Sequence, residues 1–270
     1  MIGDYIMNYV LWEKEIPYLD IGAETPNSMT FYPASDPKND KPLPCVLFCP
    51  GGAYSHRAAH EGEPIARFFN SKGIHAAVVD YRVAPNRYPA PLADAQRAIK
   101  LLRAHSTELN VNPNKIVICG FSAGGHLAAS TLVLDDVSCF GHTPDKIDNE
   151  SAAPNGAILC YPVISIKEDF GHTGTGMNLL GEKYASEADY LSLQNHISDK
   201  TQKCFLWHTS DDSCVNVKNS LIFGEYLRDH NIPFEMHIYP HGSHGLGLAA
   251  DKPDVSEWAS NAADWVLRNI

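Results

Sequence analysis

The sequence predicts an α/β fold with a mostly parallel central sheet of about eight strands and helices on both faces. Short runs of β-branched and apolar residues recur along the chain, and their near-continuous apolarity is typical of strands covered on both sides. Most of these runs precede a segment of helical periodicity, and this alternation implies parallel strands joined by right-handed crossovers. The 270 residues are 44% hydrophobic, enough for a sizeable core in a single large domain covering residues 1–270.

The strands are expected where the apolar runs fall. Six such runs are Cys45–Cys49, Ile74–Asp80, Ile116–Cys119, Gly156–Tyr161, Cys204–His208 and Phe234–Tyr239. One or two earlier strands are expected before the Pro- and Asp-rich segment that begins at Tyr32, which is interpreted as a turn. Together these runs account for about eight strands.

The helices are expected where apolar residues recur three or four positions apart. They include Ile65–Phe69, Leu92–Leu102, Ile222–Leu227 and Trp258–Val266. Residues 165–203 depart from this alternation, because the segment is Gly-rich and too long for a plain crossover. Short helices are expected within it. The segment forms either a partial cap over an active site or a surface insertion, and the sequence leaves both alternatives open.

The charge of the chain argues against nucleic acid as a partner. The formal net charge is −11, and the clustered Lys and Arg that a phosphate backbone requires do not occur in the sequence. Several acidic residues gather in one stretch, which is interpreted as a solvated loop: Asp135, Asp136, Asp145, Asp148 and Glu150.

The N-terminus and the cysteines predict a cytoplasmic protein. The first residues lack the basic and apolar regions of a signal peptide, and no window approaches the roughly 18 apolar residues of a membrane span. Seven cysteines, most of them in apolar strand-like runs, favour buried reduced thiols over a disulfide framework. None has CxxC spacing, so zinc is not expected, and neither a metal nor a cofactor is required.

A glycine-bracketed serine lies between a predicted strand and a predicted helix, in "IVICGFSAGGHLAAS" (residues 116–130). Ser122 is either a nucleophile exposed on a tight turn or a hydroxyl that caps the helix. A nucleophile would need Gly120 and Gly124 to let the strand and helix approach each other, and the amide of Ala123 would point toward a reacting carbonyl. It would also need an oxyanion loop earlier in the chain, and an acid and a histidine later.

Candidates for all three partners follow predicted strands in that order. "PGGAY" offers the amides of Gly52 and Ala53 for an oxyanion, although a Gly-Gly turn at a strand end is common by itself. "HTSDDSCV" offers two adjacent acids, Asp211 and Asp212, and the loop after the last strand offers His241 and His244. Spacing alone does not choose within either pair. His56 and His60 are interpreted as rim or surface histidines.

From about Pro44 to the C-terminus, the chain resembles the α/β-hydrolase superfamily. The resemblance is closest to its small acetyl-esterase and xylan-esterase-like (BD-FAE-like) members, which are related to hormone-sensitive lipase and arylformamidase. It is carried by "PGGAY" (Pro50–Tyr54), "EGEPIARFF" (Glu61–Phe69), "VVDYRVAP" (Val78–Pro85), "YPAPLADAQRAI" (Tyr88–Ile99), "GFSAGGHLA" (Gly120–Ala128), "HTSDDSCVNVKNSL" (His208–Leu221) and "GSHGLGLA" (Gly242–Ala249).

The resemblance implies which residue of each pair is catalytic. The family's acid stands four residues after a strand-end histidine and three before a valine, which matches Asp212. Its histidine directly precedes a "GLGLA"-like segment, which matches His244. The "DYR" at 80–82 and Asp94 match scaffold positions. Related lipases carry His-Gly-Gly-Gly where this chain has Pro-Gly-Gly-Ala at 50–53, but Ala53 has the same backbone N–H to donate, so the departure bears on the acyl pocket.

These residues predict a serine carboxylic-ester hydrolase that forms an acyl-enzyme. The catalytic residues would be Ser122, Asp212 and His244, with an oxyanion hole made by the amides of Gly52, Ala53 and Ala123. The resemblance implies a small-molecule or oligosaccharide ester as substrate, with short acyl groups such as acetyl. Two alternatives are an amide-cleaving relative, such as an arylformamidase or peptidase-like hydrolase, and a binding module that retains the fold without activity.

Overall fold

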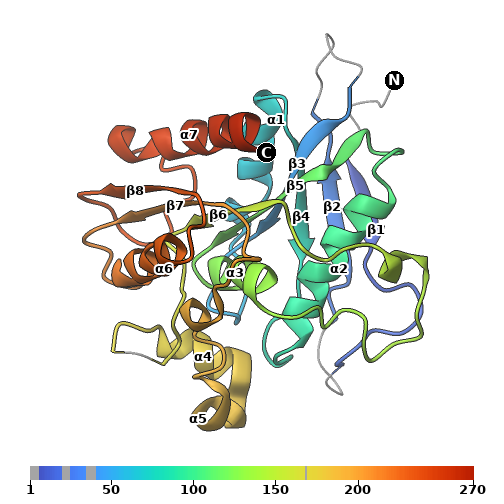
Figure 1. The fold of residues 1–270 in the computed structure, drawn as a ribbon, viewed down its shortest axis with the longest axis horizontal. Coiled ribbons are helices and arrows are strands. Elements are labelled where there is room, and N and C mark those ends of the chain that lie inside the picture. The colour runs from blue at the N-terminus through green and yellow to red at the C-terminus, as the bar shows by residue number, and fades with distance from the viewer. Residues whose placement is uncertain (1–5, 20–24, 35–40, 168) are drawn as a thin grey trace.

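An eight-stranded sheet runs through the computed structural model, which describes residues 6–19, 25–34, 41–167 and 169–270 (Figure 1). The strands are β1 (Met7–Val10), β2 (Ser28–Tyr32), β3 (Leu43–Cys49), β4 (His75–Asp80), β5 (Val111–Phe121), β6 (Gly156–Cys160), β7 (Cys204–Thr209) and β8 (Phe234–Tyr239). Their order in the sheet is β1-β2-β4-β3-β5-β6-β7-β8. β1–β2 and β2–β4 pair antiparallel, and every other neighbouring pair is parallel. The predicted fold class is confirmed. Most of the expected turn after Tyr32 lies outside the described residues.

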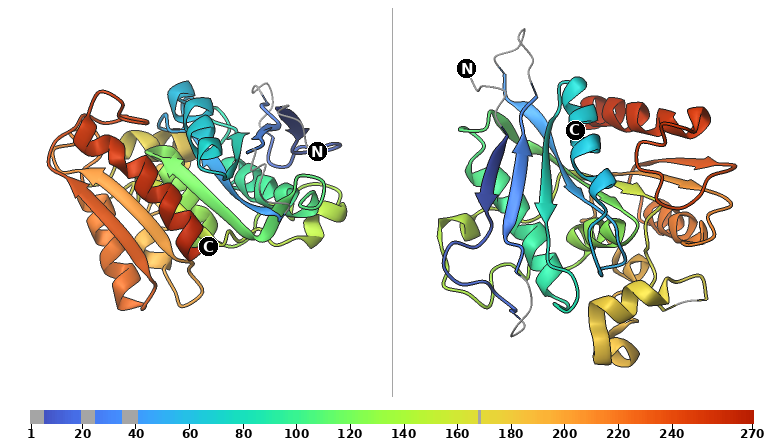
Figure 2. Two further views of the ribbon diagram at one scale, coloured as in Figure 1. Left: turned by 90° about the horizontal axis from the view of Figure 1, so that it is seen from above. Right: turned by 180° about the vertical axis from the view of Figure 1, so that it is seen from behind.

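Helices cover both faces of this sheet, as Figures 1 and 2 show. The long helices are α1 (Glu63–Ser71), α2 (Ala90–Ala104), α3 (Ala123–Val133), α6 (Lys218–Asp229) and α7 (Pro253–Asn269), and two 3₁₀ turns are η1 (Ala59–Glu61) and η2 (Lys146–Asn149). Residues of α1 and α7 pack in one apolar cluster, whereas α2, α3 and α6 contribute to the other. The parallel strands therefore have a hydrophobic layer on each side.

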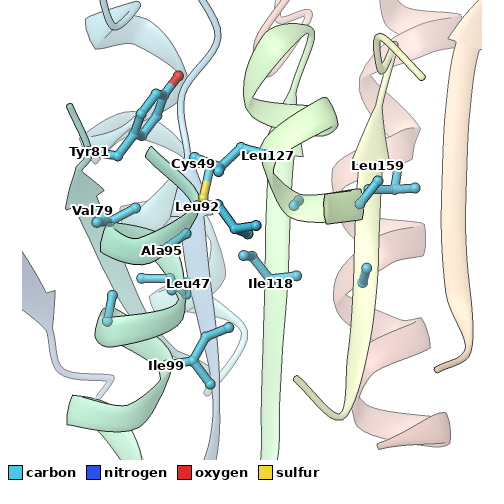
Figure 3. Packing of buried hydrophobic residues seen from close by; sticks show 14 of the residues in the cluster. Leu47, Cys49, Val79, Tyr81, Leu92, Ala95, Ile99, Ile118, Leu127 and Leu159 are labelled. Carbon is cyan, nitrogen blue, oxygen red and sulfur yellow. The ribbon is translucent and has the colours of Figure 1, made fainter. Parts of the chain in front are cut away.

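The side chains of β3 show why its sequence is apolar without alternation. Leu47 lies in the cluster that includes Ile118 and residues of α2 (Figure 3). Its neighbour Phe48 points to the opposite face, where its ring lies 5.2 Å from that of Phe69 in α1. Successive residues of a strand point to opposite faces, so a strand buried on both sides is apolar at every position.

Residues 165–203 contain the short helices that the sequence predicts. These are α4 (Thr173–Leu180) and α5 (Tyr184–Glu187), with 3₁₀ turns η3 (Gly181–Lys183) and η4 (Leu193–His196). Figure 1 shows α4 and α5 projecting beyond the helices that cover the sheet.

The acidic stretch does more than form a solvated loop, and that prediction is wrong for three of its residues. Asp136 pairs with the buried Lys100 of α2 at 2.8 Å. Arg97, also buried in α2, pairs with Asp145 and Asp148. A buried cation requires a nearby counter-charge, and these carboxylates supply it.

A buried ion pair joins the "DYR" segment to α2. Arg82 and Asp94 are both fully buried, and the carboxylate accepts hydrogen bonds from the Arg82 Nε and Nη2 at 2.8 Å each. Asp94 also accepts from the Arg82 amide and from the Trp12 indole, each at 2.9 Å. All four acceptor positions of the carboxylate are therefore in use.

We expect Asp94→Asn to lower the free energy of unfolding by about 3–5 kcal/mol, because it leaves the Arg82 charge buried without a counter-charge. Urea denaturation followed by circular dichroism measures the change. Glu63→Gln is the matched control: Glu63 pairs with Arg67, both side chains are more than half exposed, and the expected change is below about 0.5 kcal/mol. Equal effects of the two substitutions would contradict the structural role of the buried pair.

Two buried histidines are held in the neutral form. His126 Nδ1 lies 3.0 Å from the Tyr54 hydroxyl and its Nε2 lies 2.9 Å from the Leu191 carbonyl. His75 Nδ1 accepts from the Ala34 amide at 3.0 Å. Burial lowers the pKa of each imidazole from 6.5 to about 4, and a carbonyl acceptor opposes this only in part.

We expect the protein to lose stability as the pH falls from 6.5 toward 4. In this window the unfolded chain binds protons at both histidines while the folded chain does not, so acid favours unfolding. Each histidine contributes at most about 3 kcal/mol. Thermal unfolding at pH 7, 6 and 5 measures the effect, and His126→Gln is expected to flatten the dependence. An unchanged Tm across this range would contradict the prediction.

Candidate active site

Ser122 occupies a tight turn between β5 and α3. Its backbone has φ 53° and ψ −117°, and its side chain makes no capping hydrogen bond to the helix. A Cβ atom on Gly120 would lie 2.0 Å from the Gly124 carbonyl oxygen, and one on Gly124 would lie 2.0 Å from that of Cys49. Both positions therefore require glycine, as the sequence predicts, and the hydroxyl is not a helix cap.

The Ser122 hydroxyl lies at one end of a continuous hydrogen-bonded chain. His244 Nε2 is 2.8 Å from Ser122 Oγ, and His244 Nδ1 is 2.7 Å from Asp212 Oδ2. The three residues come from the turn after β5, the loop after β8 and the loop after β7. The structure thus brings together the serine, histidine and acid that the family resemblance selects.

Asp212 makes three hydrogen bonds and also faces a second imidazole. Its Oδ1 accepts from the amides of Cys214 and Val215, at 2.8 and 3.0 Å. Its Oδ2 faces both His244 and the buried His208, whose Nε2 is 3.3 Å away. Burial by itself would raise the pKa of Asp212, but these hydrogen bonds outweigh it and hold the pKa well below its usual range. The carboxylate is therefore charged at neutral pH.

The other member of each candidate pair forms a separate contact at the surface. Asp211 Oδ2 lies 3.0 Å from His241 Nδ1, and both side chains are at least half exposed. Asp211 also accepts from the Gly242 amide at 2.8 Å. Asp211 and His241 thus connect the loop after β7 to the loop after β8. Among the described residues, neither side chain has a hydrogen bond to Asp212, His244 or Ser122.

The loop after β3 lies against Ser122. A Cβ on Gly51 would be 3.1 Å from the Ser122 Cβ. Gly52 and Ala53 follow with φ of 130° and 52°. None of the backbone hydrogen bonds found among the described residues uses the amide of Gly52, Ala53 or Ala123. Amides without a protein acceptor beside a nucleophile are the donors that an oxyanion hole needs.

The segment 165–203 contacts both sides of this site. Asn178 in α4 donates to the Ala53 carbonyl at 2.8 Å. His172, which precedes α4, lies 3.8 Å from the Cys214 thiol. Burial and the nearby His244 both lower the pKa of the His172 imidazole.

Sequence reasoning missed several residues around the site. Glu61 accepts from the Gly51 amide, Tyr161 packs its ring edge-on against His244, and His208 supports Asp212. In the sequence, Glu61 and His208 stand out only as parts of family-like segments. Tyr161 lies 100 residues from Glu61, so no local pattern indicates that contact, whereas His208 lies only four residues before Asp212.

The described residues include no cluster of three His, Cys, Asp or Glu side chains arranged to hold a metal ion. Within the same ranges, no helix combines the length and apolarity needed to cross a bilayer. All seven cysteines are free thiols, as the sequence predicts, and five of them are buried.

Comparison with known proteins places this geometry in a family. The BD-FAE family model matches residues 32–227. The chain belongs to the BD-FAE family. This confirms the esterase-like α/β-hydrolase resemblance that the sequence motifs indicate.

Two named proteins are similar to this chain over most of its length. It is 36% identical to endo-1,4-beta-xylanase B of Butyrivibrio fibrisolvens over 249 residues, which cover 90% of this chain and 38% of that protein. It is 32% identical to an acetylxylan esterase of Xylanibacter ruminicola, over 75% of this chain and 41% of that protein. The chain therefore spans about two fifths of the length of these two relatives.

One solved structure matches nearly end to end. It is an acetyl ester-xyloside bifunctional hydrolase from Caldicellulosiruptor lactoaceticus, with 45% sequence identity and a TM-score of 0.87. The match covers 96% of this chain and 94% of that one.

Proposed function

We propose that this protein is a serine carboxylic-ester hydrolase. The observation that carries the proposal is the unbroken chain from Asp212 through His244 to Ser122. It ends beside the amides of Gly52, Ala53 and Ala123, which no backbone hydrogen bond among the described residues uses. A buried carboxylate, an imidazole and a hydroxyl in this order form the machinery of acyl transfer. The roles of these residues and of the oxyanion amides are part of the proposal.

In the first half of the reaction, Ser122 Oγ attacks the ester carbonyl and its proton passes to His244 Nε2. The amides of Gly52, Ala53 and Ala123 bind the resulting oxyanion, and Asp212 stabilises the imidazolium. The carbon–oxygen bond to the alcohol then breaks, and the alcohol leaves with the proton from His244. In the second half, His244 takes a proton from water, which attacks the acyl-enzyme. The bond between the acyl carbon and Ser122 Oγ then breaks, His244 returns the proton to Ser122 Oγ, and the acid leaves.

The substrate class follows from the relatives. Both an acetylxylan esterase and an acetyl ester-xyloside hydrolase resemble this chain over most of its length, which supports acetyl esters of sugars or xylo-oligosaccharides. The contacts of Asn178 and His172 support a partial cap formed by residues 165–203 on the single domain. A cytoplasmic location remains part of the proposal, supported by the free thiols.

A covalent label tests the nucleophile, and a substrate panel tests the reaction. A fluorophosphonate probe is expected to attach to Ser122, as peptide mass spectrometry would show. p-Nitrophenyl acetate is expected to react faster than the octanoate ester, and acetylated xylo-oligosaccharides are expected to release acetate. Labelling at another residue would contradict the nucleophile assignment. Hydrolysis of N-formylkynurenine with none of the acetyl esters would instead support the amide-cleaving alternative.

A further inference from the structure

A buried carboxylate lies behind the loop that follows β3. Glu61, the last residue of η1, is 2% exposed. Its Oε2 accepts from the Gly51 amide at 2.7 Å, and its Oε1 accepts from the Tyr161 hydroxyl at 2.6 Å. Each carboxylate oxygen therefore holds one donor, and the Gly51 donor belongs to the loop that carries the oxyanion amides.

Tyr161 links Glu61 to the loop that carries His244. Its hydroxyl accepts from the Gly247 amide at 3.1 Å. Its ring lies 5.0 Å from the His244 ring in an edge-on arrangement with an interplanar angle of 68°. Burial and the charge of Glu61 raise the pKa of Tyr161 well above its usual value, so the hydroxyl keeps the proton that it donates.

A second contact ties the same two loops together. His60, beside Glu61, has its Nε2 2.9 Å from the Gly245 carbonyl, and Trp258 in α7 donates to the Gly247 carbonyl at 3.0 Å. Gly247 has φ 54°, and a Cβ there would lie 3.0 Å from the His60 ring. The loop after β8 is thus seated against η1 within three residues of His244.

We propose that Glu61 and Tyr161 are positioning residues, which together fix the oxyanion loop and the His244 loop in one relative placement. The inference rests on the proposed function, because it assigns these residues to the same hydrolytic site. Neither side chain contacts the Ser122 hydroxyl in the hydrogen bonds found among the described residues. They act through the Gly51 amide, the Gly247 amide and the His244 ring.

The backbone of the oxyanion loop explains why it needs a brace. Gly52 and Ala53 both have positive φ, which is costly for alanine, so the loop holds this shape only while its surroundings impose it. Donors of an oxyanion hole must meet the developing charge at about 2.7–3.1 Å, and a misplacement of about 1 Å can cost roughly a hundredfold in rate. Loss of the carboxylate oxygen that accepts from the Gly51 amide therefore weakens stabilisation of the transition state more than it weakens substrate binding.

Glu61→Gln is the sharpest test, because it keeps the shape of the side chain and removes one acceptor. The N–H₂ group of the new glutamine must face one of two partners. One is the Gly51 amide, which is itself a donor, and the other is the Tyr161 hydroxyl, which already accepts from Gly247. We expect kcat for p-nitrophenyl acetate to fall by about 10- to 100-fold with KM within about twofold. Tyr161→Phe is expected to lower kcat by about tenfold.

The double variant and a control separate positioning from general damage. Both single substitutions break the same connection, so Glu61→Gln with Tyr161→Phe is expected to lose less than the product of the single losses. Glu63→Gln, two residues further along on an exposed side chain, is expected to keep the unmodified kcat. Ki for a trifluoromethyl ketone, which forms a tetrahedral adduct, is expected to rise by the same factor as kcat/KM falls.

The result that overturns the inference is a folded Glu61→Gln protein, by Tm and circular dichroism, with unmodified kcat. A loss confined to KM, or a Ki for the trifluoromethyl ketone that does not change while activity falls, would overturn it as well. Failure of the proposed function looks different, because the unmodified protein itself would then neither hydrolyse the ester nor take the fluorophosphonate label.

Discussion

Replacing Ser122 by alanine is expected to lower kcat for p-nitrophenyl acetate by about 10⁵- to 10⁶-fold. Removal of the nucleophile from a comparable triad leaves only the contribution of the oxyanion hole and substrate binding. The variant is expected to fold, because the Ser122 side chain makes no capping hydrogen bond to α3. Alanine at this position would adopt the same backbone φ and ψ as serine does. Steady-state kinetics on the purified protein and loss of fluorophosphonate labelling measure the effect.

Ser130→Ala provides a matched control for this substitution. Ser130 lies in the same helix, α3, and its hydroxyl donates to the His126 carbonyl at 2.8 Å, away from the site. This control is expected to keep its activity within about twofold and to lose about 1 kcal/mol of stability. If Ser122→Ala retained a tenth of the activity while the label moved to another residue, the assignment of Ser122 would be refuted.

The fold class was predictable because burial on both faces leaves a strong local signal. β3 and β6 are buried at every position, so their apolar runs stand out in the sequence. The order of the strands had no such signal, since it depends on which distant segments pair. β5 is also longer than its apolar run, because it begins five residues earlier at the buried Val111 and continues through Asn112, Pro113, Asn114 and Lys115, which are not buried.

The site was predictable in part for a different reason. Ser122 is marked by glycines that steric contact requires, and those glycines are adjacent in the sequence. The choice between Asp211 and Asp212 depends on the turn after β7, which buries one carboxylate and exposes the other. Glu61 carried no local signal, because Tyr161 is 100 residues away. The acidic stretch was misinterpreted likewise, since its partner Arg97 lies 48 residues before Asp145.

Asp212→Asn is expected to lower kcat by about 10⁴-fold, although the substitution keeps the shape of the side chain. The hydrogen-bond partners of residue 212 fix the orientation of the asparagine side chain. Oδ1 accepts from two backbone amides, those of Cys214 and Val215, so the asparagine oxygen must remain on that side. The amide N–H₂ then faces His244 in place of Oδ2.

His244 would respond by changing its tautomer. With N–H groups opposite Nδ1, that nitrogen must accept, so the proton moves to Nε2 and points at Ser122. An imidazole in this form cannot take the serine proton, which is why the loss is in kcat. Asp211→Asn changes only an exposed pair with His241 and is expected to stay within about threefold. Kinetics on p-nitrophenyl acetate compare the two variants, and the reverse ranking would transfer the role of the acid to Asp211.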